Sequence, residues 1–227
     1  MQKEEKKDKK RKKKENPHKR PFSIEIIENQ NKPILYKVAT DIGFRTSGIT
    51  FLNMESGEIK CINYKKNADC KVQGMKIVDL LNLCKETIRT YLSLLPLEIK
   101  NHLDQTQFIF EEPLLIANQR SFSISLYIFL SQLIEYYIKE LHVHSVCLVV
   151  PGSAKKLIGF SPREHMPDSI KTQFIKEYLP NANCPNNHCA DSVFSIILTN
   201  QQLLKELYPE LKILKEVSYE VYKSQLI

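Results

Sequence analysis

The fold of this chain is decided by one stretch, Tyr36-Lys37-Val38-Ala39-Thr40-Asp41-Ile42-Gly43, which runs on through Phe44 into Ile49-Thr50-Phe51. A short apolar segment ends in a carboxylate and a glycine, and a second apolar segment follows. This pattern is typical of a buried strand that brings Asp41 to the edge of a sheet and then turns back as a hairpin. A carboxylate at the end of a core strand is costly unless positive charge meets it. We therefore expect a metal ion, a phosphate-bound cation or a basic side chain beside Asp41, with a turn aspartate that caps the hairpin as the alternative.

Length and composition set the limits for the rest of the chain. The 227 residues, 42% of them hydrophobic, are enough for one core with a small appendage. Because no apolar run in the sequence reaches the roughly 18 residues that cross a bilayer, no membrane partner is expected. The chain begins with Lys and Glu where a secreted protein has a hydrophobic signal region, so we expect it not to be secreted. Six cysteines without such a signal favour free thiols in an intracellular, reducing compartment.

The positive charge is concentrated at the N-terminus. Residues 1–20 hold eleven Lys and Arg against four Asp and Glu, and this surplus of seven equals the +7 of the whole chain. We interpret residues 1–32 as a disordered Lys-rich arm and residues 33–227 as one folded domain. The arm suits phosphate backbones, which makes Lys10, Arg11 and Lys12 candidate DNA contacts. Nuclear import, or a solubilising tail without a partner, are the alternatives.

Hydrophobic periodicity predicts three strands in succession, followed by helices that alternate with two further strands. Strands separated by helices favour parallel pairing, while the first three are close enough to form an antiparallel meander. The fold class is therefore α/β, with a mixed five-stranded sheet flanked by helices. The expected strands are 34–41, 47–53, 58–64, 107–113 and 143–150, and the expected helices are 77–95, 122–137, 168–179, one that Asn186 or Asn187 caps, and 201–217.

Acidic residues stand where core elements begin or end. Asp41 ends the first strand, and Glu111 and Glu112 end the fourth. At the start of a late helix, His188 and Asp191 share one face because they are three residues apart. If the first and fourth strands are neighbours, Asp41 and Glu111 lie side by side at one sheet edge, with the late helix over them. Alternation along a strand puts Glu111 and Glu112 on opposite faces, so only one of the two can face this site.

Carboxylates that converge in this way destabilise one another unless cations neutralise them. Oxygen donors with one imidazole suit Mg²⁺ or Mn²⁺ better than zinc, and two such ions about 4 Å apart can support phosphodiester hydrolysis. The alternatives are a helix N-terminal histidine without a metal role at His188, and a first-turn acid favourable to the helix dipole at Asp191. A zinc site at Cys184, His188 and Cys189 is disfavoured because the sequence has no Cys-x-x-Cys.

The order of these elements and their motifs resembles the RuvC-type Holliday junction resolvases of the RNase H-like superfamily, and is similar to the resolvases of poxviruses and other large DNA viruses. The resemblance spans about residues 36–200 and depends on three motifs, Asp41-Ile42-Gly43, Phe108-Ile109-Phe110-Glu111 and His188-Cys189-Ala190-Asp191-Ser192. It implies that four residues are catalytic and hold two Mg²⁺ or Mn²⁺ ions per active site. These residues are Asp41, Glu111, His188 and Asp191.

The resemblance also gives roles to basic residues. Lysines after the fifth strand lie near the scissile phosphate in this family, which implies catalytic and DNA-binding roles for Lys155 and Lys156. A solvated pair in a loop is the alternative. Arg120 and Arg163 are further candidate contacts to the DNA backbone.

The expected function is a structure-selective, magnesium-dependent endonuclease that resolves four-way DNA junctions in recombination, repair or the processing of viral replication concatemers. Two symmetric cuts require two sites, so the resemblance implies a homodimer, with an interface on an apolar helix face within 120–140. The place of action would be the nucleus or the viral factories of a host cytoplasm. One alternative is a phosphotransferase, because Asp41-Ile42-Gly43-Phe44-Arg45-Thr46-Ser47-Gly48 also resembles the first phosphate motif of actin-like and sugar kinases. The other alternative is a non-catalytic junction-binding protein.

Overall fold

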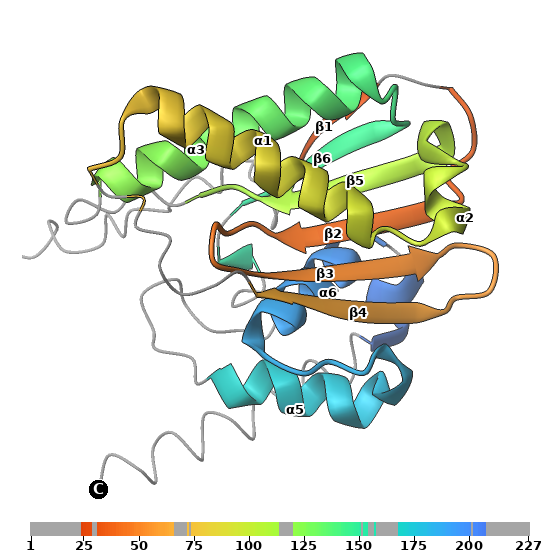
Figure 1. Ribbon diagram of the computed structural model, residues 1–227. Helices are drawn as coiled ribbons and strands as arrows, with labels where there is room; N and C mark the ends of the chain where they lie inside the picture. The colour runs from red at the N-terminus through yellow and green to blue at the C-terminus, as the bar shows by residue number, and fades with distance from the viewer. Residues whose placement is uncertain are drawn as a thin grey trace, which may run out of the picture.

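A computed structural model shows an α/β architecture, in which a mixed six-stranded sheet is covered by helices on both faces (Figure 1). The structure describes residues 24–28, 31–65, 72, 74–113, 120–150, 152–153, 157, 168–200 and 202–207. The strands are β1 (Ile24–Glu28), β2 (Tyr36–Asp41), β3 (Thr46–Asn53), β4 (Ile59–Lys65), β5 (Thr106–Glu111) and β6 (Ser145–Val149). The α-helices are α1 (Ile77–Leu94), α2 (Leu97–Lys100), α3 (Arg120–Glu135), α5 (Asp168–Tyr178) and α6 (Asn187–Thr199). Shorter helical turns are η1 (Leu103–Gln105), η3 (Tyr136–Glu140) and η4 (Pro180–Ala182).

The strand order is β1-β6-β5-β2-β3-β4. Strands β2, β3 and β4 form the expected antiparallel meander, and β5 pairs in parallel with both β2 and β6. The mixed α/β sheet is therefore confirmed, with β2 and β5 as direct neighbours. This pairing matters for function because the carboxyl ends of two parallel neighbours lie at the same edge.

The expectation of five strands is wrong by one. Strand β1 lies inside the range 1–32 that we interpreted as a disordered arm, and it pairs antiparallel with β6 from Ile24 opposite Val149 to Glu28 opposite Ser145. The five residues of β1 were missed because they gain order from the open backbone edge of β6, which a local pattern does not reveal. Residues 1–23 of that arm, with Lys10, Arg11 and Lys12, lie outside the described residues.

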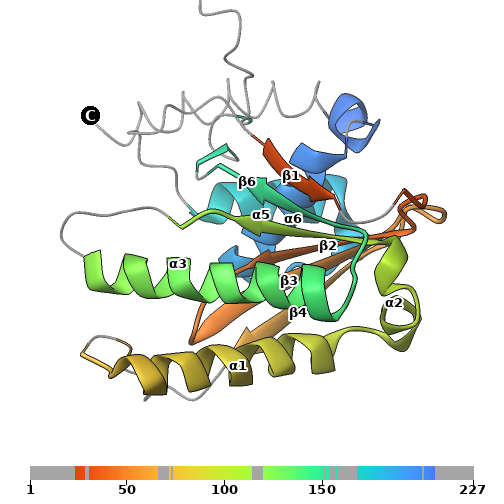
Figure 2. The ribbon, with the colours of Figure 1, turned by 90° about the horizontal axis from the view of Figure 1, so that it is seen from above.

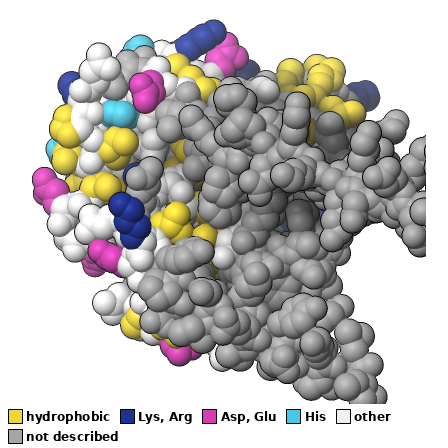
Figure 3. Space-filling view, turned by 180° about the vertical axis from the view of Figure 1, so that it is seen from behind, with side chains coloured by type: hydrophobic (Ala, Val, Ile, Leu, Met, Phe, Trp, Pro, Cys, Tyr) yellow, Lys and Arg dark blue, Asp and Glu magenta, His cyan; other side chains and the backbone are white. Residues whose placement is uncertain are grey.

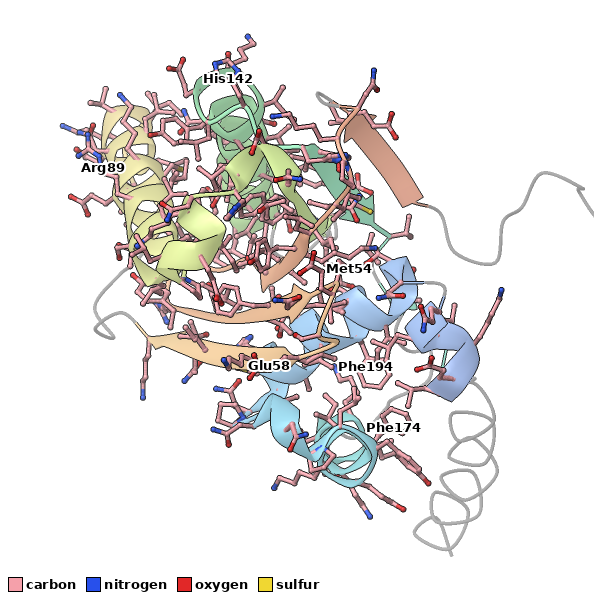
Figure 4. All side chains as sticks on the ribbon, turned by 90° about the vertical axis from the view of Figure 1, so that its right-hand side faces the viewer. Met54, Glu58, Arg89, His142, Phe174 and Phe194 are labelled. Carbon is pink, nitrogen blue, oxygen red and sulfur yellow. The ribbon has the colours of Figure 1, made fainter. Side chains whose placement is uncertain are left out.

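Two layers of helix cover the sheet (Figure 2). Side chains alternate along each strand, so that Val38 and Phe108 pack with α1 and α3 while Ala39 and Ile109 pack with α6. All four are at most 1% exposed. Helix α5 lies outside α6, and the two helices are joined by the ring contact of Phe174 and Phe194, which point toward each other with ring centroids 5.7 Å apart (Figure 4).

The helix boundaries follow the local sequence. Pro96 separates α1 from α2, because proline has no backbone N–H with which to continue the hydrogen bonds of α1. The side chain of Asn186 accepts a hydrogen bond from the Cys189 amide and caps α6, which confirms one of the two expected caps. Of the helix expected over 201–217, residues 202–207 are described and helical. None of the helices within the described ranges is long and apolar enough to span a membrane.

Candidate active site

Asp41 and Glu111 end two adjacent parallel strands. The register pairs Thr40 of β2 with Phe110 of β5, so the two acids follow at the same level of the sheet edge. Both project on the face that α6 covers, because Ala39 and Ile109, two residues earlier, pack in the core under α6. The strand adjacency on which the predicted site depended is therefore confirmed.

Helix α6 lies directly on this edge because β3 provides a glycine under its first turn. Gly48 is the register partner of Asp41. A Cβ atom at Gly48 would lie 2.1 Å from the carbonyl carbon and oxygen of His188, well inside any real contact. Only a residue without a side chain lets the α6 backbone come this close to the strand. Gly48 thus sets the distance between the sheet edge and the part of α6 that carries His188 and Asp191.

His188 is the positive partner of Asp41. Its Nδ1 lies 2.6 Å from Asp41 Oδ2, and its Nε2 lies 2.9 Å from the Thr46 hydroxyl. The hydrogen bond to Asp41 is the main reason that the pKa of the imidazole is raised. The sequence predicted a cation beside Asp41, and in this structure a half-buried histidine from the other end of the chain takes that position.

A second ion pair joins α5 to α6. Lys171 of α5 donates to Asp191 Oδ1, and the side chain of this lysine is only 8% exposed. Lys171 is not among the site residues predicted from the sequence. The signal that points to it is helical spacing, because Lys171, Phe174 and Ile175 fall on one face of α5 and all three are buried. A lysine on the apolar face of a helix needs a buried anion nearby.

Glu111 is the third carboxylate of the cluster. Its Oε1 accepts a hydrogen bond of 3.0 Å from the amide of Gly152, which follows β6. Burial raises the pKa of Glu111 to about 7, and the charges of Asp191 and Asp41 push it in the same direction. The three acids are therefore close enough to repel one another, although they come from three separate elements.

Glu112 points away from this cluster. Its Oε1 accepts a hydrogen bond of 3.3 Å from the hydroxyl of Tyr127, a residue of α3 on the opposite face of the sheet. The alternation expected for the two neighbouring glutamates is thus confirmed, and the structure selects Glu111 as the one beside Asp41.

Tyr91 of α1 holds the turn that follows Asp41. Its buried hydroxyl donates to the Gly43 carbonyl (3.0 Å), accepts from the Gly43 amide (3.3 Å) and contacts the hydroxyl of Ser47. Burial also raises the pKa of Tyr91, which keeps this hydroxyl protonated as a donor. Tyr91 is not among the site residues predicted from the sequence, because it follows the same helical spacing as the apolar residues of α1.

The donor set of the cluster fits hard divalent cations such as Mg²⁺ or Mn²⁺. Asp41, Glu111 and Asp191 offer carboxylate oxygens, and the charges of Asp191 and Asp41 add to the effect of burial in raising the pKa of Glu111. Within the described part of the chain, however, no three His, Cys, Asp or Glu side chains are grouped tightly as metal ligands. In this arrangement His188 and Lys171 are the cations that pair with Asp41 and Asp191.

Other predicted site residues are not placed by the structure. Lys155, Lys156 and Arg163 lie outside the described residues, and Arg120 begins α3 with a side chain that is not described. Their roles stay predictions from the resemblance. No protein-family model matches this chain, and no curated protein matches its sequence.

Proposed function

We propose that this chain is a metal-dependent endonuclease that cuts branched DNA, with the RNase H-like fold of the RuvC-type resolvases. One observation carries the proposal, namely that Asp41, Glu111, His188 and Asp191 gather from β2, β5 and α6 at a single sheet edge. The sheet supports it as well, because a three-stranded antiparallel meander continued by parallel strands is what the resemblance implies.

Each residue of the cluster has a role in this proposal. Mg²⁺ or Mn²⁺ held by Asp41, Glu111, His188 and Asp191 would supply water activation and charge stabilisation for phosphodiester hydrolysis. The Gly152 amide orients Glu111, and one nitrogen of His188 would have to leave its present partner, Asp41 or Thr46, to bind an ion. Lys171 is a buried cation that pairs with Asp191 and would offset part of the negative charge beside a bound phosphate.

DNA attraction is assigned mainly to the basic arm. Residues 21–227 have no net charge, since residues 1–20 account for the full +7. On the face seen in Figure 3, acidic and basic side chains of the described residues are interspersed. Contacts to the scissile strand would come from Lys155, Lys156, Arg120 and Arg163, and the arm would add Lys10, Arg11 and Lys12.

The proposed homodimer would use α3. Phe122 is 40% exposed and Ile124 is 51% exposed near the start of this helix, and Tyr136 just beyond its end is 36% exposed. Large apolar side chains on one exposed helix support an interface between two copies of the chain. A dimer would present two sites to the two strands that must be cut.

The test uses a labelled four-way junction beside linear duplex and RNA–DNA hybrid, with Mg²⁺ or Mn²⁺ titrated. We expect cleavage of the junction, and the variant Asp41→Asn should still bind it while cleavage falls by at least about 100-fold, as when charge-stabilising groups are removed. The matched control is Glu112→Gln, because Glu112 faces α3 and should tolerate the change. Normal magnesium-dependent cutting by Asp41→Asn refutes the proposal.

A non-catalytic junction-binding protein is the second candidate. It is favoured by the two ion pairs, because His188 and Lys171 already neutralise two of the three carboxylates. Junction binding without cleavage at any Mg²⁺ or Mn²⁺ concentration would select this candidate in the same assay.

A further inference from the structure

Three free cysteines lie together on the α6 side of the sheet. Cys61 belongs to β4, Cys184 to the segment that leads into α6, and Cys189 to the first turn of that helix. Cys61 packs against the buried side-chain cluster that holds Cys184 and Cys189, and its thiol meets that of Cys184. Asn183, which adopts a left-handed backbone conformation (φ 45°), turns the chain just before Cys184. Residues 61 and 184 are thus brought together by the fold alone.

We propose that Cys61 and Cys184 are a redox pair that a peroxide joins into an intramolecular disulfide and a dithiol reductant separates again. Cys61 is the partly exposed member, through which a small oxidant reaches the pair, and Cys184 is buried. Cys184 is the partner because its side chain meets that of Cys61, whereas the fully buried Cys189 thiol donates to the backbone carbonyl of Ile62 at 3.6 Å.

The chemistry balances with the peroxide as the oxidant. The Cys184 thiolate attacks one peroxide oxygen, the O–O bond breaks, and Cys184 becomes a sulfenic acid as water leaves. The Cys61 sulfur then attacks the Cys184 sulfur, the S–O bond breaks, and a second water leaves. In total the two thiols lose two protons and two electrons, and one hydrogen peroxide molecule becomes two water molecules.

Cys184 is suited to react first. Its hydrogen bond with Cys61 lowers the pKa of Cys184 and raises that of Cys61, and the positive charge of Lys176 adds to the lowering. The thiolate is the nucleophile in both disulfide exchange and peroxide reduction. The difference in pKa between the two thiols therefore favours Cys184 as the attacking residue and Cys61 as the resolving residue.

Oxidation acts on the candidate active site through the start of α6. A disulfide brings the two sulfur atoms to about 2 Å, which draws Cys184 toward β4. Two residues later, the Asn186 side chain caps α6 through the Cys189 amide at 3.0 Å. His188 and Asp191 are in the first turns of this helix. A shift of Cys184 toward β4 therefore displaces the Asn186 cap and moves both residues away from Asp41 and Glu111. This consequence rests on the proposed function, whereas formation of the disulfide does not.

Peptide mapping of the full chain tests the disulfide. After treatment with hydrogen peroxide, trypsin should release residues 61–65 linked to residues 177–205, and dithiothreitol should separate them. Because the second peptide holds Cys184 and Cys189, the variant Cys184→Ser identifies the partner, and it should abolish the link as Cys61→Ser does. Cys84→Ser is the control, since Cys84 is buried in α1 and should leave the link intact. No link, a link that survives in Cys184→Ser, or only intermolecular links would overturn the proposal.

Thermal unfolding and cleavage provide two further readouts. The disulfide should raise the Tm of the oxidised chain by roughly 5 °C, because it constrains the unfolded chain across a long loop, and Cys61→Ser should show no such rise. Junction cleavage should fall at least about tenfold on oxidation, as expected when catalytic groups are misplaced, and return with dithiothreitol. Should the reduced protein not cleave at all, the nuclease proposal fails while the mapping result still decides the redox pair. An oxidised chain that carries the link and cleaves at the full rate would overturn the proposed effect on α6.

Discussion

Single residues of the acidic cluster differ in how much positive charge they receive. Nδ1 of His188 lies 2.6 Å from Asp41, and Lys171 pairs with Asp191. Within the described part of the chain, the hydrogen-bond partner of Glu111 is the uncharged Gly152 amide. Burial, together with the charges of Asp191 and Asp41, makes the Glu111 carboxyl keep its proton more firmly than a carboxyl in water does. The same buried acid that suits a divalent cation is a source of instability when no cation neutralises it.

The stability of the protein should reflect this acid through its pH dependence. The pKa of Glu111 is about 7 in the folded state against an ordinary value of 4.5. Between these values the folded chain holds more protons than the unfolded chain, so the free energy of unfolding should fall as the pH rises through this window. The substitution Glu111→Gln removes this fall in the free energy of unfolding. At pH 8 without divalent cations, the variant should be more stable than the wild type by on the order of 2 kcal/mol.

Urea unfolding at pH 4 and pH 8 measures this difference. The two proteins should have similar stability at pH 4, where Glu111 is protonated in the folded chain and mostly protonated in the unfolded chain. Glu112→Gln is the matched control, and it should keep the wild-type pH profile because its side chain lies on the α3 face. A Glu111→Gln curve parallel to the wild type from pH 4 to pH 8 would contradict the assignment.

At the scale of elements, the approach of α6 to β3 is the contact on which the site depends. Helix α6 brings two of the four cluster residues, and Gly48 is the position where its backbone meets the sheet. Helix α5 supports α6 from outside through Phe174 against Phe194 (Figure 4). The ion pair of Lys171 and Asp191 joins the same two helices. The site is therefore positioned by helix packing, although its acids begin at strand ends.

The substitution Gly48→Ala tests this packing. The added methyl group would meet the His188 backbone at 2.1 Å, which cannot be relieved by turning a side chain. We expect a loss of about 1–3 kcal/mol in unfolding free energy, typical of overpacking, together with a large loss of cleavage. Gly57→Asn is the control, because nothing lies within 4 Å of its added Cβ and asparagine tolerates its positive φ. Wild-type stability and activity in Gly48→Ala would show that α6 does not need this close approach.

At the scale of the whole molecule, the net charge and the sheet belong to different parts of the chain. The first 20 residues carry the entire net charge, while the sheet begins at Ile24 with β1. Strand β1 covers the edge of β6, which would otherwise expose unpaired backbone groups. The N-terminal region thus has two separable roles, one in charge and one in completing the sheet.

Two truncations should separate these roles. Removal of residues 1–20 should leave the Tm unchanged, but it should weaken duplex binding at low salt by at least about tenfold and flatten its salt dependence, because fewer counterions are released. Removal of residues 1–30 also deletes β1, and should lower the Tm and promote aggregation through the β6 edge. Fluorescence anisotropy over a salt series and thermal unfolding measure the two effects. An unchanged salt slope after loss of residues 1–20 would contradict the role of the arm.

The sequence by itself determined the features that depend on neighbours along the chain. The apolar run before Asp41 and the one before Glu111 follow strand periodicity, and the three-residue spacing of His188 and Asp191 follows helix geometry. These patterns were enough to predict the α/β class, the order of the main elements and the four acidic-site positions. They are local, because the period of side chains along a strand or helix is set by backbone geometry alone.

Only the tertiary structure decided which distant groups meet. It paired β2 with β5, placed β1 on the edge of β6, turned Glu111 toward Asp41, and brought Lys171 and Tyr91 to the site. The local patterns do not name the partners in these contacts. Strand β1 has no partner until β6 exists, and helical spacing puts Lys171 on a buried face of α5 without saying that Asp191 is the anion it meets. The physical reason is that pairing and burial are properties of two surfaces together, and a single segment of sequence specifies only one of them.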